Sequence, residues 1–111
     1  MLRVRDLISD NHTRVGIVIE RAKRPTAAWI RDQKDQRVRN LTDEEVWWRV
    51  LPLEGGSVLV PDSLATRIRE ANYADVMNAI EHGNDHAARE LGFVFPEILD
   101  AAHRQRTEKN G

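Results

Sequence analysis

The chain contains no cysteine among its 111 residues. A disulfide framework, a zinc site built on thiolates and a cysteine nucleophile are therefore all excluded. Aromatic residues make up only 5% of the sequence, and no apolar run approaches the roughly 18 residues that a membrane-spanning helix needs. The charged start, residues 1–6, does not resemble a signal peptide. We therefore expect a soluble, cytoplasmic protein with no membrane partner.

The length limits the architecture. A chain of 111 residues with 41% hydrophobic and 32% charged residues fits one domain with a modest core, which leaves little room for a deep substrate cavity. We expect residues 1–111 to form that single domain.

The net charge of −1 conceals an asymmetry between the two parts of the chain. Residues 1–41 hold ten basic and five acidic residues, a net charge of +5, whereas residues 42–111 hold seven basic and thirteen acidic residues, a net charge of −6. One interpretation is a basic N-terminal face that attracts phosphate or an acidic protein, and the other is mutual attraction of the two halves.

The most informative stretch is the run from Glu45 to Pro61. Two apolar extended segments flank the pair Gly55-Gly56, which predicts an antiparallel hairpin. A hairpin this apolar must close a small β core or contact a partner. Further short strands are predicted before it by alternating or β-branched residues, at 2–7, 14–20, 26–31 and 36–41.

Short strands at this spacing suggest a small twisted antiparallel barrel. The run Val15–Glu20 followed by Ala28–Arg31 resembles the second and third strands of Src-homology-3-like barrels, and Gly16-Ile17-Val18 is similar to a strand of KOW-type barrels. The resemblance implies a barrel within about residues 2–66. The upstream KOW glycines and the acidic, aromatic-rich loop of polyproline-binding members are missing, so it implies no particular ligand.

The periodicity changes to helical after about residue 70. Asn72 is typical of a helix cap, and Gly83 predicts a left-handed helix end. Asn84 and Pro96 suit the starts of two further helices. We therefore expect an α+β fold, with an antiparallel Src-homology-3-like barrel in residues 1–69, three short helices packed on it in residues 70–106, and a frayed tail in residues 107–111.

Catalytic and metal-binding signals are weak. His82 and His86 have the spacing of two ligands on one helical face, but Gly83 is expected to end that helix between them. The cluster Asp43–Glu45 follows Thr42 and has the spacing of a capping turn, which we favour over acid and base catalysis. We expect no catalytic residues, no metal and no cofactor.

The aromatic pair Trp47 and Trp48 is the first candidate binding feature. On a strand their side chains point to opposite faces, so at most one of them can enter the barrel core. We expect the helical extension to cover the other, and the alternatives are a partner, a dimer interface or base stacking. Trp29 is a third candidate partner-binding residue.

The second candidate is a set of basic residues in two predicted loops. They form either a rim that attracts phosphate or a solvated surface whose field is diluted by Asp32 and Asp35. The set consists of Arg21, Lys23, Arg24, Arg31, Lys34, Arg37 and Arg39.

These features predict a non-catalytic binding or assembly module that acts through protein contacts or self-association at the Trp47–Trp48 strand. The alternative is an RNA- or DNA-binding accessory protein that uses the basic loops, with a tryptophan as stacking platform. A small hydrolase or metal-dependent enzyme is the third interpretation.

Overall fold

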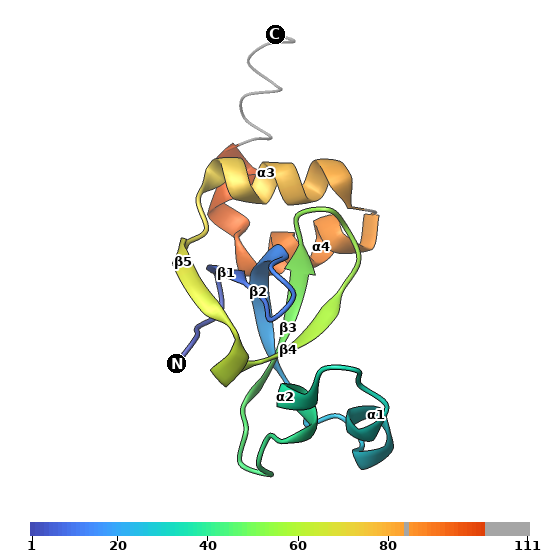
Figure 1. The fold of residues 1–111 in the computed structure, drawn as a ribbon. Helices are drawn as coiled ribbons and strands as arrows, with labels where there is room; N and C mark the ends of the chain where they lie inside the picture. The colour runs from blue at the N-terminus through green and yellow to red at the C-terminus, as the bar shows by residue number, and fades with distance from the viewer. Residues whose placement is uncertain (84, 102–111) are drawn as a thin grey trace, which may run out of the picture.

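The computed structural model describes residues 1–83 and 85–101. They form a small α+β protein with one five-stranded antiparallel sheet in the spatial order β4-β3-β2-β1-β5 (Figure 1). In chain order, the strands are β1 (Asp6–Ser9), β2 (Val15–Ala22), β3 (Trp47–Pro52), β4 (Val58–Pro61) and β5 (Thr66–Glu70).

The predicted hairpin of residues 45–61 is confirmed. β3 and β4 pair in antiparallel register, with Trp47 opposite Pro61 and Val50 opposite Val58. The connecting loop contains Gly55 and Gly56 at φ 106° and 84°. These positive values suit glycine, which has no Cβ to clash with the backbone.

The expectation of a closed barrel is not met, because β4 and β5 are the two edges of the sheet and do not pair with each other. Between them, residues 62–66 are predicted from the sequence to form a single helical turn leading out of the sheet, and the 3-10 helix η1 (Asp62–Leu64) confirms this turn. At the other end, β1 begins at Asp6 rather than near Leu2, because Arg5 has a φ of 82° and interrupts the extended backbone.

The predicted strands at 26–31 and 36–41 are wrong, because both stretches are helical. They contain α1 (Ala27–Arg31) and α2 (Gln36–Arg39), and each helix begins at a capping side chain. The Thr26 hydroxyl accepts from the Trp29 backbone N–H at 3.1 Å, and the Asp35 carboxylate accepts from the Arg37 backbone N–H at 2.9 Å. Such side-chain acceptors satisfy backbone donors that a helix start leaves without partners. We call residues 26–40 the helical lobe.

The second helical region follows β5. α3 (Tyr73–His82) starts at Asn72, which forms a capping box with Asp75, as the sequence predicted for this cap. α4 (Asp85–Val94) follows, and residues 96–101 are also helical. Gly83 does end α3, but with a φ of −93° and not in the predicted left-handed conformation. The expected cap Asn84 and the expected frayed tail lie outside the described residues.

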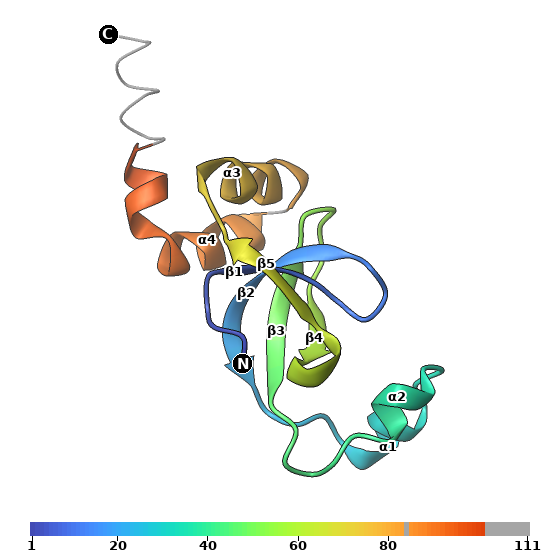
Figure 2. The same cartoon turned by 60° about the vertical axis from the view of Figure 1, so that its left-hand side comes forward.

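The helical lobe and the pair α3 and α4 lie at opposite ends of the sheet, as two views show (Figures 1 and 2). The side chains of β3 divide the core accordingly. Trp48 and Val50 belong to one cluster, with Ile8, Val18 and Val60, while Leu51 belongs to the cluster that α3 and α4 cover. Trp47 forms a third cluster with Ile30 and Val38 of the lobe. The helical extension therefore does not cover the second tryptophan, and the lobe does.

Candidate nucleic-acid interface

Trp47 and Trp48 point to opposite faces of β3, and both rings are buried. Their exposed fractions are 2% and 6%. The Trp48 indole N–H donates to Asp62 Oδ1 at 2.9 Å, whereas the buried Trp47 N–H has no acceptor among the described residues. Neither ring lies on the surface, so the structure places both in the core rather than at an accessible contact face.

Trp29 is different, because the residue is 37% exposed. It lies on α1 and meets the Trp47 ring edge to face, with ring centroids 5.9 Å apart and an angle of 83° between the planes. This geometry is a favoured one for aromatic pairs. The contact holds the Trp29 indole in place and leaves part of it in solvent.

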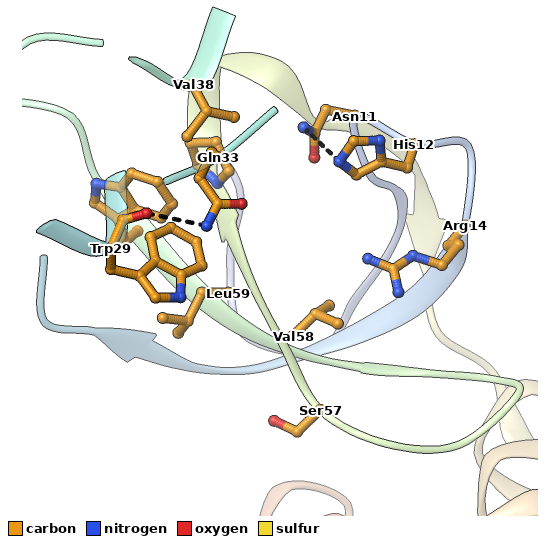
Figure 3. A pocket seen from close by; sticks show the side chains of 11 residues that line it. Asn11, His12, Arg14, Trp29, Gln33, Val38, Ser57, Val58 and Leu59 are labelled. Carbon is orange, nitrogen blue, oxygen red and sulfur yellow. Dashed lines mark hydrogen bonds between the residues drawn. The ribbon is translucent and has the colours of Figure 1, made fainter. Parts of the chain in front are cut away.

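A cavity of about 300 Å³ opens beside Trp29. Figure 3 shows Trp29 and Gln33 of the lobe on one side and Asn11, His12 and Arg14 of the β1–β2 turn on the other, with β4 running between them. Gln33 Nε2 donates to the Trp29 carbonyl oxygen at 3.0 Å. The cavity thus has an aromatic wall facing a polar one.

The polar wall is bound to the lobe by a small network. Asn11 Nδ2 donates to Asp35 Oδ2 at 3.0 Å, and a terminal nitrogen of Arg37 donates to the Asn11 carbonyl oxygen at 3.1 Å. The hydrogen bonds of Arg37 and Asn11 hold the pKa of the Asp35 carboxyl well below its usual value, and Asp35 in turn raises the pKa of Arg37. These contacts fix the lobe against the β1–β2 turn.

The turn itself is held by Asp10, which is buried. Its carboxylate accepts from the backbone N–H groups of His12 and Arg14, at 2.8 and 2.9 Å, and from Arg14 Nε at 3.0 Å. Thr13 has a φ of 64°, in the left-handed region. The polar wall of the cavity is therefore built on a tightly bonded turn.

All seven basic residues predicted from the sequence are exposed. Arg24 pairs with Asp43 at 2.9 Å, and Arg37 pairs with Asp35 at 2.9 Å. The other five have no ion-pair partner among residues 1–83 and 85–101; these are Arg21, Lys23, Arg31, Lys34 and Arg39.

The structure brings only some of these cations together. Arg31, Lys34 and Arg39 belong to the helical lobe that carries Trp29. Arg21 lies opposite Trp48 in the β2–β3 register, and paired residues of an antiparallel ladder share a face. Arg21 therefore points to the sheet face opposite Trp47 and the lobe.

Sequence reasoning missed the polar wall of Asn11, His12 and Arg14. Residues 9–12, Ser-Asp-Asn-His, are turn formers and predict a turn. The approach of this turn to residue 35 depends on the helical lobe, and the sequence predicts strands in place of the two helices of that lobe. Trp29 was predicted as a candidate, although on a strand and not on a helix.

The weaker candidates lie apart from this cavity. Glu45 accepts from the backbone N–H of Ser63, and the backbone N–H of Glu45 closes a turn on the Thr42 carbonyl oxygen. His82 contacts the Asn78 carbonyl oxygen and His86 lies 3.3 Å from Glu90. Within the described ranges, no group of three or more His, Cys, Asp or Glu side chains is placed to hold a metal ion.

A second groove, of about 420 Å³, lies between α4 and the β2–β3 face. Phe93 lines this groove and is 87% exposed. Arg49 of β3 bridges Glu20 and Glu90 there, and this contact keeps the pKa of Glu90 below its usual value and raises that of Arg49. The lining of the groove thus combines the exposed apolar ring of Phe93 with the ion pairs of Arg49.

No helix in the described part of the chain has the length and apolar character of a membrane span. No protein-family model, curated protein or solved structure matches the chain.

Proposed function

We propose that this chain is a non-catalytic binding module that binds single-stranded nucleic acid through its helical lobe. One observation carries the proposal. The partly exposed Trp29 lies on the same lobe as Arg31, Lys34 and Arg39, three cations without an acidic partner among the described residues. Aromatic faces that stack on bases, combined with cations that contact phosphates, are what single-strand binders use.

The balance of charge in this region supports the proposal. The lobe, residues 26–40, holds four basic residues, Arg31, Lys34, Arg37 and Arg39, and two acidic ones, Asp32 and Asp35. Asp35 is already engaged by Arg37 and Asn11. The lobe therefore keeps a positive field although the whole chain has a net charge of −1.

We also propose that the sheet is related to Src-homology-3-like barrels. What supports this is the meander of short antiparallel strands β1 to β4, with the run Val15–Glu20 at its centre. The relation adds little to the functional argument, because folds of this kind serve many unrelated functions.

The test is a salt titration of binding to a fluorescent single-stranded oligonucleotide, followed by anisotropy. Contacts of three cations with phosphates predict that log K falls with log salt with a slope of about −2. The double variant Arg31→Gln/Lys34→Gln should reduce the slope to about −0.7. The matched control Arg3→Gln/Arg89→Gln removes the same charge at two exposed arginines outside the lobe, neither with a side-chain partner in the described ranges. It should leave the slope nearly unchanged. An absence of binding even at low salt would overturn the proposal.

A second candidate function is self-association through the groove beside α4. Phe93 projects into solvent next to this groove. The Phe93 ring and the groove lie on the same surface of the molecule. This arrangement suits a dimer with a twofold axis, in which each copy inserts its Phe93 into the groove of the other. Sedimentation analysis tests this: a dimer that Phe93→Ser converts to monomer supports it, and a monomeric wild type at high concentration contradicts it.

A further inference from the structure

We propose that the cavity beside Trp29 is a subsite for one unpaired nucleobase, with Trp29 as its stacking wall. This inference rests on the proposed binding of single strands and adds where a base enters and what holds it. Three features of the described residues carry it: the fixed aromatic wall, the unused polar groups and the size of the cavity.

The aromatic wall is preorganised. The edge-to-face contact with Trp47 fixes the Trp29 ring. The Trp29 backbone is fixed as well, because its N–H donates to the Thr26 hydroxyl and its carbonyl oxygen accepts from Gln33 Nε2. A ring held in this way loses little conformational entropy when a base stacks on it.

The polar wall has hydrogen-bonding capacity left over. Arg14 uses Nε for Asp10, and its terminal nitrogens have no partner among the described residues. The amide oxygen of Asn11 on this wall and that of Gln33 on the Trp29 side are likewise without a donor within those residues. Base edges carry both donors and acceptors, so the cavity offers a base groups of both kinds beside Trp29 (Figure 3).

On the lobe next to the cavity, the carboxylate of Asp32, unpaired among the described residues, is outnumbered by the cations Arg31, Lys34 and Arg39. The two carboxylates in the polar network of the cavity, Asp10 and Asp35, are each paired with an arginine. Arg31 follows Trp29 by two residues and Lys34 is the neighbour of Gln33. The cations that we assign to the phosphates therefore lie on the segment that forms the stacking wall.

The volume of about 300 Å³ lies at the lower end of the range for small-molecule sites, about 300–1,000 Å³. It accommodates one base rather than a stack of several. We therefore expect the neighbouring nucleotides to remain outside, where their phosphates meet the lobe.

The experiment compares an oligothymidine with an abasic strand of the same length and charge, using wild-type protein and the pair Trp29→Phe and Trp29→Leu. Both substitutions keep an apolar side chain against Trp47, but only phenylalanine offers a face for stacking. We expect wild type to bind the base-containing strand about 5- to 100-fold more tightly than the abasic one. Trp29→Phe should keep part of this preference and Trp29→Leu should lose it, with the salt slope unchanged. Phe93→Ala, at an exposed aromatic outside the cavity, should keep all of it.

The outcomes separate the two proposals. If both strands bind equally to the wild type, or if Trp29→Leu keeps the full preference, the base subsite is wrong while nucleic-acid binding stands. If neither strand binds at low salt, nucleic-acid binding itself fails. Binding of polyglutamate as tight as that of the oligothymidine would show that the lobe selects acidic polypeptides, which also overturns the base subsite. Circular dichroism of each variant confirms that it is folded.

Discussion

The indole rings of Trp29 and Trp47 meet edge to face, 5.9 Å apart between centroids. This contact joins a residue of the helical lobe to a residue of the central hairpin. The contact helps to bury Trp47, which is 2% exposed. It also fixes Trp29, which lines the cavity and remains partly exposed to solvent. One aromatic pair thus completes a core cluster and presents a candidate stacking surface.

The adjacent residues Trp47 and Trp48 predict a difference in stability. Replacing either by phenylalanine removes similar buried volume, but only Trp48→Phe breaks an indole hydrogen bond, to Asp62. The loss of a bond to a charged acceptor costs about 1–3 kcal/mol. We expect Trp48→Phe to lower the free energy of unfolding by about that much more than Trp47→Phe, as measured by urea denaturation. Equal losses in the two variants would contradict the assigned hydrogen bond.

The cap of α3 predicts a local effect. Asn72 accepts from the Asp75 backbone N–H at 3.0 Å, so Asn72→Ala should lower the free energy of unfolding by about 1 kcal/mol. The control is Asn78→Ala, at an exposed position within α3, which we expect to change stability by less than about 0.5 kcal/mol. Thermal unfolding of the two variants measures both effects, and similar losses would argue against the capping box.

Glu90 predicts part of the pH dependence. Its pKa lies below the usual 4.5, and the main cause is the hydrogen bond that it accepts from Arg49. Between the pKa of the folded state and about pH 4.5, the Glu90 carboxyl therefore binds more protons in the unfolded chain than in the folded one. Its contribution to stability is complete above about pH 4.5 and is lost as the pH falls through the folded-state pKa. Glu90→Gln should cost about 1–2 kcal/mol at neutral pH and should lose less stability than wild type on acidification to about pH 3. Glu54→Gln, at an exposed residue, should follow the wild-type profile.

Asp35 predicts how firmly the lobe is attached. Its carboxylate caps α2, pairs with Arg37 and accepts from Asn11. Asp35→Ala should therefore raise hydrogen-exchange rates in the lobe while the amides of β2 and β3 stay protected. Asp32→Ala, on the same lobe but without a side-chain partner among the described residues, serves as control. Uniformly faster exchange over the whole sheet would mean that the lobe does not open separately.

The sequence predicted the hairpin, the η1 turn and the cap of α3 because each depends on local chemistry. Glycines at positive φ, β-branched runs and an Asn cap act over a few residues. The lobe was misread because Ile30 and Val38 occupy apolar positions that fit a short strand as well as a short helix. Thr26 and Asp35 were available as capping signals, but a single capping residue does not distinguish a helix from a turn.

Of the residues of the candidate site, the sequence predicted only those that belong to the helical lobe. Trp29 and the basic residues were visible in the sequence, whereas Asn11 and Arg14 reach the cavity through the β1–β2 turn. That approach depends on where the lobe docks, which is a tertiary contact between residues 11 and 35. The prediction of a closed barrel was wrong for a related reason. Whether β4 and β5 pair depends on the path that the chain takes through η1, and this path leaves the two strands at opposite edges of the sheet.

The most direct test of nucleic-acid binding follows the three tryptophan indole N–H resonances by NMR during titration with a single-stranded oligonucleotide. We predict that the Trp29 resonance shifts together with the amides of the lobe, while the Trp48 indole, bonded to Asp62, stays in place. An unchanged Trp29 resonance at saturating oligonucleotide, or shifts confined to α4 around Phe93, would contradict the account.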